Sequence, residues 1–288
     1  MMKCVLIILN YNDSHRALEL AQKSKKYNNI NRVVIVDNKS TDNSVEYLEN
    51  QTESCDKIDI LKARSNKGFA AGNNIGARYV TKKYQPEYIL FANTDTIFEE
   101  NDINECIKYM NVKENLGLVS MRIKDIKGNE ERSAWSFKSF FEYAMFNIWL
   151  YRRLTYRQGV YTNFNERFQY VNIVRGSFMF FNASALEQVD FFDEGTFLYY
   201  EEEIISKKLQ KSGYKVGLIT NHFYIHNHIS GASSNKWFIK KYMDKSLYYF
   251  LSKYYEIGRI KKAFFVLTIG ISYIENICID IIKKILKK

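Results

Sequence analysis

Short apolar runs alternate with helix-like segments through the first 110 residues, and this alternation restricts the fold more than any other feature. Runs typical of buried strands occupy residues 4–9, 32–36, 58–61 and 88–92. Helical spacing or capping residues indicate helices between them, at residues 14–27, 42–48, 72–81 and 101–110. Strands that alternate with helices build a parallel sheet with helices on its faces. The sequence therefore predicts an α/β fold.

Polar residues follow each of the four runs. They are Asn10, Tyr11 and Asn12, then Asp37 and Asn38, then Asn66, Lys67 and Gly68, and last Asn93, Thr94 and Asp95. Ligands of open α/β sheets bind outside the carboxyl ends of the strands. We therefore expect all four sets to gather along one edge of the sheet.

Composition narrows the class of protein. The 288 residues are 46% hydrophobic and 26% charged, which suits one large α/β domain with a C-terminal extension. The net charge of +10 suits an anionic partner such as a nucleotide diphosphate, an anionic lipid or nucleic acid, unless it is only a lysine-rich bias. The four cysteines show neither metal-ligand nor disulfide spacing, which predicts reduced thiols and a cytoplasmic protein.

No secretory leader and no membrane span are expected. The apolar run at residues 5–9 is short and ends at the polar Asn10. No stretch reaches the roughly 20 apolar residues that cross a bilayer, because the run at residues 263–274 is interrupted by Glu275 and Asn276.

Asp37 and the glycine-rich segment at residues 66–76 are candidate nucleotide contacts. A carboxylate after a strand can accept hydrogen bonds from a base or a ribose, although Asp37 could instead only cap the next helix. Glycines allow close backbone approach, and amides at a helix N-terminus favour phosphate. The segment matches neither the dinucleotide-binding fingerprint nor the phosphate-binding loop of nucleoside triphosphatases.

Asn93, Thr94 and Asp95 are candidate metal ligands, because carboxylate and amide oxygens suit Mg²⁺ or Mn²⁺. A metal here would neutralise the charge that develops on a leaving diphosphate. One aspartate supplies only part of a site. His226 and His228 stand at alternate positions of one predicted strand and share a face, which makes them candidate partners. The alternative for the first three residues is the N-cap of the helix that follows.

Three adjacent glutamates, Glu201, Glu202 and Glu203, follow an aromatic segment. Carboxylates held close together raise the pKa of one member, which suits a general base. Neighbours on a helix point about 100° apart, so all three cannot face one site. The alternative is an acidic first turn that complements the helix dipole, and we prefer it for Glu203.

Two aromatic segments remain. Residues 140–156 are expected to form a helix that either packs on the core or lines an acceptor groove. Residues 237–288 interleave lysines and arginines with aromatic side chains, which suits a helix in the interface of an anionic membrane. The alternative is a pair of helices that pack on the rest of the chain or form a homodimer. Nucleic acid is not expected as a partner, because no recognition motif accompanies the charge.

These motifs, in this order, resemble glycosyltransferase family 2, the inverting enzymes of GT-A fold, and especially rhamnosyltransferase-like bacterial members that build surface polysaccharide. The matching stretches are LIILNYN, VVIVDNKSTDNS, NKGFAAGNNIG and YILFANTD, followed by residues 175–228. The resemblance covers residues 3–234. It implies a nucleotide-sugar part at residues 1–115 and an acceptor and base part at 116–236. Residues 237–288 lie beyond the resemblance and are expected to form a helical tail.

The resemblance also implies roles on the donor side. Residues that would hold the nucleobase are Asn10, Tyr11 and Asp37, and those along the nucleotide are Asn66 and Gly68. Asn93, Thr94 and Asp95 stand where the family has its DXD metal motif, with Asp95 as the metal-binding acid and Asn93 in place of the first acid. The family pattern H-x-x-G-x-S begins at His228, which favours His228 over His226 as the second metal ligand.

On the acceptor side, the resemblance implies that Glu201 and Glu202 replace the family's Glu-Asp pair. Glu202 is the expected base, and Glu201 and Glu203 are contenders. The function implied is inverting transfer, with Mg²⁺ or Mn²⁺, from a UDP- or dTDP-sugar to a hydroxyl of a glycan or lipid-linked acceptor. A tail on the membrane would place it at the inner face of the plasma membrane.

Two other functions compete with this one. A sugar nucleotidyltransferase would need a glycine- and arginine-rich triphosphate loop, which residues 6–13 lack. An inactive nucleotide-binding scaffold of a polysaccharide assembly complex is the alternative outside enzymes. The presence together of Asp95, Glu202 and His228 argues against a scaffold.

Overall fold

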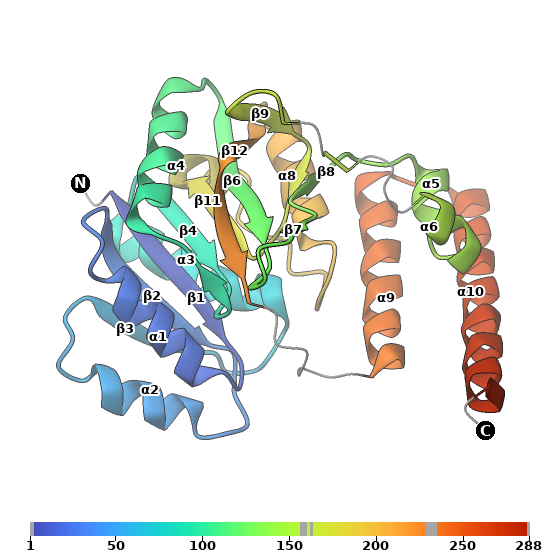
Figure 1. Cartoon of the computed structure of the whole chain (residues 1–288), viewed down its shortest axis with the longest axis horizontal. Coiled ribbons are helices and arrows are strands. Elements are labelled where there is room, and N and C mark those ends of the chain that lie inside the picture. The colour runs from blue at the N-terminus through green and yellow to red at the C-terminus, as the bar shows by residue number, and fades with distance from the viewer. Residues whose placement is uncertain (1–2, 156–159, 162–163, 228–234, 287–288) are drawn as a thin grey trace.

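The computed structural model describes residues 3–155, 160–161, 164–227 and 235–286. It shows an α/β body with two long C-terminal helices beside it (Figure 1). The first half alternates strand and helix as expected, in the order β1 (Cys4–Asn10), α1 (Ser14–Ser24), β2 (Ile30–Asp37), α2 (Ser44–Thr52), β3 (Ile58–Lys62), α3 (Phe69–Tyr84), β4 (Tyr88–Ala92), β5 (Thr96–Ile97) and α4 (Glu100–Val112). The predicted α/β class is confirmed.

The second half adds strands of mixed direction and short helices. Its strands are β6 (Leu116–Lys124), β7 (Glu130–Glu131), β8 (Ala134–Trp135), β9 (Phe168–Val171), β10 (Ile173–Val174), β11 (Phe178–Asn182) and β12 (Lys215–His226). Its helices are α5 (Phe140–Met145), α6 (Trp149–Thr155), α7 (Ala183–Gln188), α8 (Glu201–Lys211), α9 (Lys236–Tyr254) and α10 (Arg259–Leu286). The segment at residues 140–156 is expected as one helix, but its described part, residues 140–155, contains two.

One large sheet runs through the body in the order β3-β2-β1-β4-β11-β6-β12-β5. The first four strands are parallel, so their carboxyl ends lie at one edge. β11 is antiparallel to both β4 and β6, and it carries the sheet from the first half of the chain into the second. β12 then runs parallel to β6 and pairs with β5 at the far end.

The sheet is the middle of three layers. On β1, Cys4, Leu6 and Ile8 face a core shared with α1, α2 and α4, while Val5 and Ile7 face a second core shared with α3, α7 and α8. All five side chains are fully buried. A strand buried on both faces reads as a continuous apolar run, which is why these strands could be found in the sequence.

Two helix starts differ from the sequence-based expectation. α3 begins at Phe69, three residues before the expected start, because Gly68 adopts a left-handed φ of 98° and caps it. α2 begins at Ser44, two residues after the expected start, with Asn43 as its N-cap residue. Both shifts are of the size that local cap geometry controls.

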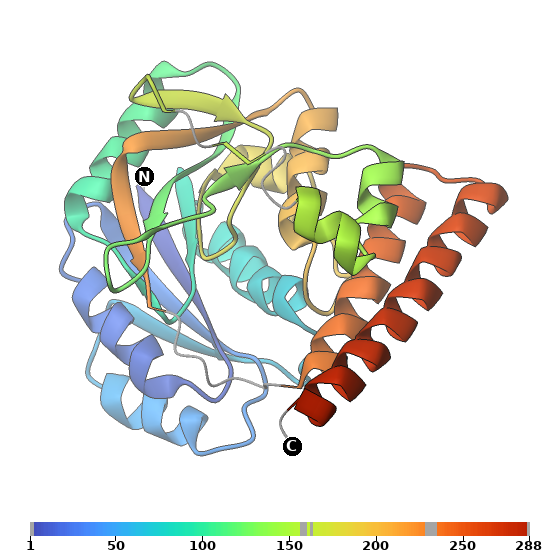
Figure 2. The same ribbon diagram turned by 45° about the vertical axis from the view of Figure 1, so that its right-hand side comes forward.

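The C-terminal helices share a third apolar cluster with the body. Phe140 and Tyr143 of α5 and Ile204 of α8 pack with Phe250 of α9 and Phe265 of α10. In Figure 2 the two orange and red helices lie side by side against the body. The aromatic segment at residues 140–156 therefore begins with a helix that packs in an apolar core, one of the two roles expected for it, and this core is shared with the tail.

The expectation that no segment could span a membrane was wrong. One helix in the described part of the chain, over Arg259–Lys283, is long and apolar enough to cross a bilayer by length and composition. Glu275 and Asn276 do not end this helix. Glu275 accepts a hydrogen bond from the Trp149 amide at 2.8 Å, and the buried Asn276 donates to the Ser272 carbonyl at 2.7 Å.

Candidate active site

The first two strand ends form one hydrogen-bonded cluster. Asn10 Nδ2 donates to Asp37 Oδ2 at 2.8 Å, and the Ser40 amide donates to Asp37 Oδ1 at 2.9 Å. Asp37 is 1% exposed, and it holds the loop before α2 without capping that helix. Both carboxylate oxygens already accept hydrogen bonds, so Asp37 positions Asn10 and Ser40. Tyr11, beside them, is 46% exposed and free to contact a ligand.

The third strand end joins this cluster through Asn38. Asn38 Nδ2 donates to Asn66 Oδ1 at 3.1 Å and to the Gly68 carbonyl at 3.2 Å. A Cβ atom on Gly68 would lie 2.0 Å from the Phe197 carbonyl oxygen, and the Phe69 amide donates to that same oxygen at 3.0 Å. The close approach that this glycine permits therefore serves the chain around Phe197, whereas the sequence suggested a phosphate.

The fourth strand end holds Asp95 beside a histidine. The Asn93 amide donates to the Ser177 carbonyl at 3.0 Å, and the Thr94 hydroxyl hydrogen-bonds to the Asp13 carboxylate. Asp95 Oδ1 lies 3.3 Å from His226 Nε2, and both side chains are largely buried. The four sets of polar residues thus lie along one sheet edge, as predicted.

Asn93, Thr94 and Asp95 are not the cap of the next helix. α4 begins with a capping box in which the Glu99 side chain accepts from the N3 backbone and Asp102 Oδ2 accepts from the Glu99 amide at 2.8 Å. Asn93, Thr94 and Asp95 therefore do not cap α4.

Asp95 and His226 are a pair of side chains that could both bind one metal ion. A carboxylate oxygen suits Mg²⁺ or Mn²⁺, and an imidazole nitrogen suits Mn²⁺ better than Mg²⁺. No group of three or more histidine, cysteine or acidic side chains that could hold a metal ion is found within residues 3–155, 160–161, 164–227 and 235–286. His228, the expected second ligand, lies outside the described residues. A bound metal would take its remaining ligands from phosphate and water, as Mg²⁺ commonly does.

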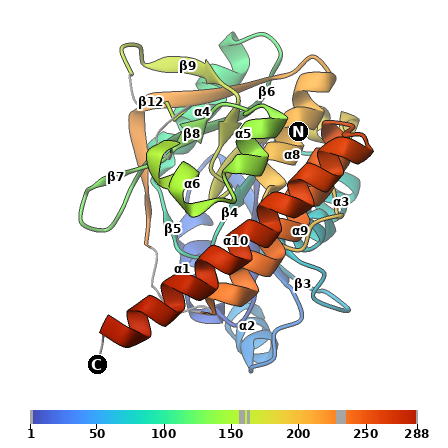
Figure 3. The same ribbon diagram turned by 90° about the vertical axis from the view of Figure 1, so that its right-hand side faces the viewer.

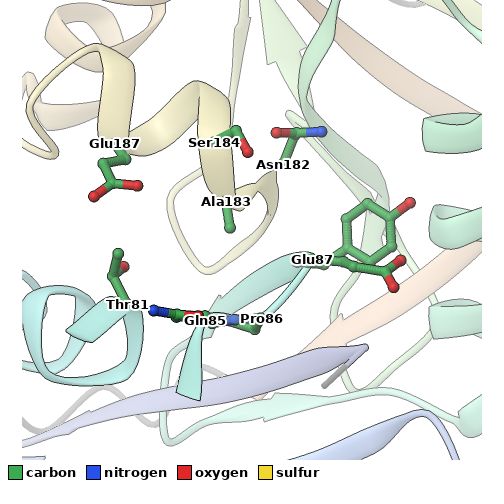
Figure 4. A pocket seen from close by; sticks show the side chains of 9 residues that line it. Thr81, Gln85, Pro86, Glu87, Asn182, Ala183, Ser184 and Glu187 are labelled. Carbon is green, nitrogen blue, oxygen red and sulfur yellow. The ribbon is translucent and has the colours of Figure 1, made fainter. Parts of the chain in front are cut away.

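A small cavity of about 150 Å³ adjoins Asp95 between α1 and β5. Thr94 and Asp95 line it together with Arg16 and Lys23. A much larger cavity of about 520 Å³ lies at the opposite edge of the sheet, where β4 begins. Figure 4 shows it between the turn at Gln85 and Pro86 and the start of α7. None of the candidate site residues lines this larger cavity.

The three glutamates have three different environments. Glu202 Oε1 accepts a hydrogen bond from the Gly176 amide at 3.0 Å, and Glu203 Oε1 accepts one from Trp135 Nε1 at 3.0 Å. Glu201 is 7% exposed, and its Oε1 has no hydrogen-bond partner within the part of the chain that is described. The helix-dipole role preferred for Glu203 is therefore incomplete, because its carboxylate also anchors Trp135.

Burial and the charge of Glu202 raise the pKa of Glu201, and the same two causes raise the pKa of Glu203. The backbone before them is unusual as well. Tyr199 and Tyr200 both adopt left-handed φ angles, of 74° and 70°. Two such residues in succession store strain that only the surrounding structure can maintain, which is typical of functional sites.

Glu202 is the glutamate joined to the Asp95 motif. Its partner Gly176 precedes Ser177, whose carbonyl accepts from both the Asn93 amide and the Thr96 hydroxyl. A two-residue link thus connects the expected base with the chain on either side of Asp95, the expected metal-binding acid. No local pattern in the sequence indicates these contacts of Gly176 and Ser177, nor that of Trp135.

Comparisons with known proteins identify the family. The family described as "Glycosyl transferase family 2" matches residues 5–190. Rhamnosyltransferase WbbL of Escherichia coli is 27% identical over 164 residues, 55% of this chain and 60% of the relative. Low-salt glycan biosynthesis hexosyltransferase Agl10 of Haloferax volcanii is 25% identical over 226 residues, 77% of this chain and 66% of the relative. The chain therefore spans about two thirds or less of the length of these relatives.

Solved structures share the fold at low sequence identity. The mannosyltransferase PcManGT from Pyrobaculum calidifontis, in complex with GDP-Man and Mn²⁺, has a TM-score of 0.59 and 13% identity, over 94% of this chain and 73% of that one. S. aureus TarS 1-349 in complex with UDP-GlcNAc has a TM-score of 0.56 and 14% identity, over 93% and 70%. The fold is the GT-A fold with a helical C-terminal extension.

Proposed function

This chain belongs to glycosyl transferase family 2, and from that premise we propose an inverting glycosyltransferase. Its donor would be a UDP- or dTDP-sugar, and its acceptor a hydroxyl of a glycan or lipid-linked molecule in surface polysaccharide synthesis. The observation that carries the proposal is the link from Glu202 through Gly176 and Ser177 to Asn93. It joins a candidate base to the strand end that would hold the donor diphosphate.

On the donor side, Asn10, Tyr11 and Asp37 would hold the nucleobase, and Asn66 and Gly68 would lie along the nucleotide. Exposure of Tyr11 supports a stacking contact, while the buried Asp37 supports a positioning role for Asn10. Asn93, Thr94 and Asp95 would lie at the diphosphate. This division assigns donor binding to residues 1–115, acceptor binding and the base to residues 116–236, and a separate role to the tail.

Asp95 would hold Mg²⁺ or Mn²⁺ together with His228 or with the adjacent His226. When bound, the metal supplies charge neutralisation for the leaving nucleoside diphosphate. His226 already lies against Asp95, and it is the histidine whose position supports a ligand role. An enzyme that requires the metal should lose donor affinity in EDTA.

Glu202 would act as the general base. Its carboxylate takes the proton of the acceptor hydroxyl while that oxygen attacks the anomeric carbon, and the bond from that carbon to the diphosphate oxygen breaks. One displacement inverts the configuration. Glu201 is the second candidate, because burial raises its pKa towards the range that suits a base.

A cytoplasmic location at the inner face of the plasma membrane completes the proposal. The basic and aromatic tail supports it, and a homodimer formed through the tail is the alternative.

A thermal-shift panel of nucleoside diphosphates with Mn²⁺, followed by a donor turnover assay, tests this function. A ligand that binds the native state raises the melting temperature, so UDP or dTDP should stabilise the protein in Mn²⁺ more than in EDTA. Turnover of the matching radiolabelled sugar nucleotide identifies an enzyme. Binding without any turnover to water or acceptor would instead identify the inactive scaffold.

A further inference from the structure

A cavity of about 370 Å³ lies between α6, α9 and α10, and side chains that can donate hydrogen bonds line it. Apolar side chains of Phe146, Ile239 and Met243 form much of its wall. Three cationic residues, Arg152, Lys236 and Lys240, line it as well. A cavity with apolar walls and several cations suits a ligand that carries an anionic group on an apolar chain.

The cations differ in how they are paired. Lys240 forms a buried ion pair with Asp244 at 3.0 Å, and Lys236 pairs with Asp280 at 2.9 Å. Arg152 forms no ion pair with any described residue. Asn147 Nδ2, also in the cavity lining, is buried without a hydrogen-bond partner in the described part of the chain. An unpaired guanidinium and an unused amide donor would both be satisfied by a phosphate.

The cavity adjoins the start of the helix that carries the candidate base. Tyr200 lines it, and Glu201 and Glu202 are the next two residues of the chain. Tyr200 also stacks on Phe250 of α9, with ring centroids 6.0 Å apart. Tyr200 therefore belongs both to the wall of the cavity and to the N-cap of α8.

α10 forms one wall of the cavity, and its polarity is the reverse of that of an ordinary surface helix. Between residues 263 and 282 every exposed residue is apolar or glycine, namely Ala263, Val266, Leu267, Gly270, Ile271, Ile274, Ile277, Cys278, Ile281 and Ile282. Thr268, Ser272 and Asn276 are buried on the inward face. Figure 3 shows α10 as the outermost helix, crossing over α9. So continuous an apolar face requires a cover.

The charges on α10 favour an anionic lipid surface as that cover. Its two acids, Glu275 and Asp280, bond to Trp149 and Lys236 of the protein. The basic residues lie at its two ends, in residues 259–262 and 283–284. If two copies paired through α10, basic ends would meet basic ends in either orientation, which is unfavourable. The inward bonds also keep α10 flat against the body, so the geometry favours a helix that lies in the membrane interface.

We propose that this cavity is the acceptor site, and that it binds the phosphate of a lipid-linked acceptor while the apolar face of α10 lies in the membrane beside it. The phosphate bonds to Arg152 and Asn147, and the lipid chain leaves along α10 towards the bilayer. This inference rests on the proposed function, because it supplies the acceptor for the same base.

Titration calorimetry with farnesyl diphosphate tests the cavity. The titration is done in EDTA and on both wild type and Asp95→Ala, so that metal-dependent binding at the donor site does not contribute. Farnesyl diphosphate should bind more tightly than either inorganic pyrophosphate or farnesol. Arg152→Ala should weaken it about tenfold or more, as expected for a lost charge-assisted hydrogen bond, and Arg152→Lys should retain part of the affinity.

Arg153→Ala is the matched control, because Arg153 is the next residue of α6, is exposed and does not line the cavity. Equal losses in Arg152→Ala and Arg153→Ala would overturn the proposal, since they would show only attraction to a basic surface. Equal affinity for pyrophosphate and farnesyl diphosphate would overturn it as well. If UDP still stabilises the protein in these cases, the proposed function stands and only the acceptor site is wrong.

Sedimentation with vesicles tests the membrane face. Vesicles of phosphatidylglycerol and phosphatidylcholine should bind the wild type, while Ile274→Glu should bind far less, because Ile274 is 65% exposed on α10. Val112→Glu is the control, since Val112 is equally exposed on α4. Equal binding by the wild type and Ile274→Glu would overturn the membrane contact. A wild type that stays unbound and forms a dimer that Ile274→Glu abolishes would assign the face to a second copy.

Discussion

The two sides of the candidate site are held in place by different means. The strand-end side, with Asn10, Asp37 and Asp95, is fixed by the register of parallel strands and by hydrogen bonds between neighbouring strand ends. The base side is a loop and a helix start, and it is fixed by contacts with distant elements. We therefore expect the strand-end side to control donor binding and the base side to control turnover.

The loop over residues 193–200 shows how the base side is held. Asp193 accepts hydrogen bonds from Tyr249, Lys253 and Tyr254 of α9. Ser246 of α9 donates to the Leu198 carbonyl at 2.7 Å. On the other side, the Phe69 amide of α3 donates to the Phe197 carbonyl. The segment that leads to the glutamates is therefore held between the donor part and the tail.

The largest expected effect is on the strand-end side. Asp95→Ala removes the carboxylate that would hold the metal, so metal-dependent binding of the nucleoside diphosphate should fall below detection. Calorimetry with UDP or dTDP in Mn²⁺ and in EDTA measures it. If the diphosphate binds equally well in EDTA to the wild type, Asp95 holds no metal that matters for the donor.

Glu202→Gln tests the other side. It keeps size and hydrogen bonding but cannot take a proton, so turnover should fall by about 10²–10⁴ while donor affinity is unchanged. Steady-state kinetics and the same calorimetry separate the two quantities. A comparable fall in Glu201→Gln, with Glu202→Gln active, would move the base by one residue.

Asp193→Ala should loosen the base side without affecting the strand ends. Burial alone would raise the pKa of Asp193, but Lys253, Tyr254 and Tyr249 outweigh it and lower the pKa to about 2. Losing these bonds should cost about 2–3 kcal/mol of unfolding free energy, measured by urea denaturation. Turnover should fall and donor affinity should hold. Asp56→Asn, at an exposed position, is the control, and a drop in donor affinity would contradict the separation of the two sides.

The smallest effect concerns pH. The pKa of Glu201 is raised to about 8 from 4.5 by burial and by Glu202. The unfolded state therefore loses its proton first, and stability should fall as pH rises through this window. In Glu201→Gln, the fall in unfolding free energy between pH 5 and pH 8 should be smaller by about 1–2 kcal/mol, measured by denaturation at each pH. Glu46→Gln, an exposed first-turn glutamate of α2, should leave the slope unchanged.

The strand-end side was predictable from sequence because its order is local. A fully buried strand is a continuous apolar run, and the next residue is placed by the strand itself, as Asn10, Asp37 and Asn93 show. On the base side, the sequence indicated the three candidate glutamates but not their contacts. That Glu202 contacts Gly176 and Glu203 contacts Trp135 depends on pairs 26 and 68 residues apart, for which no local pattern exists.

The tail, too, was predictable from the sequence only in part. Its helical character was predicted, but the membrane-length apolar stretch of α10 was missed because polar residues inside a helix were read as an interruption. In the folded protein Glu275 and Asn276 face inward and leave the outer face apolar. Which side of a helix is exposed depends on its neighbours, and here the neighbours are α5, α6 and α9.

The bonds that Asp193 accepts from α9 also bear on where the protein can be cut. The family match ends at residue 190, three residues before Asp193. A shortened protein that ends before α9 would leave the Asp193 carboxylate without Tyr249, Lys253 and Tyr254. Expression of a minimal fragment should therefore retain α9. The family match at residues 5–190 is therefore shorter than the part of the chain that has to fold together, which includes α9.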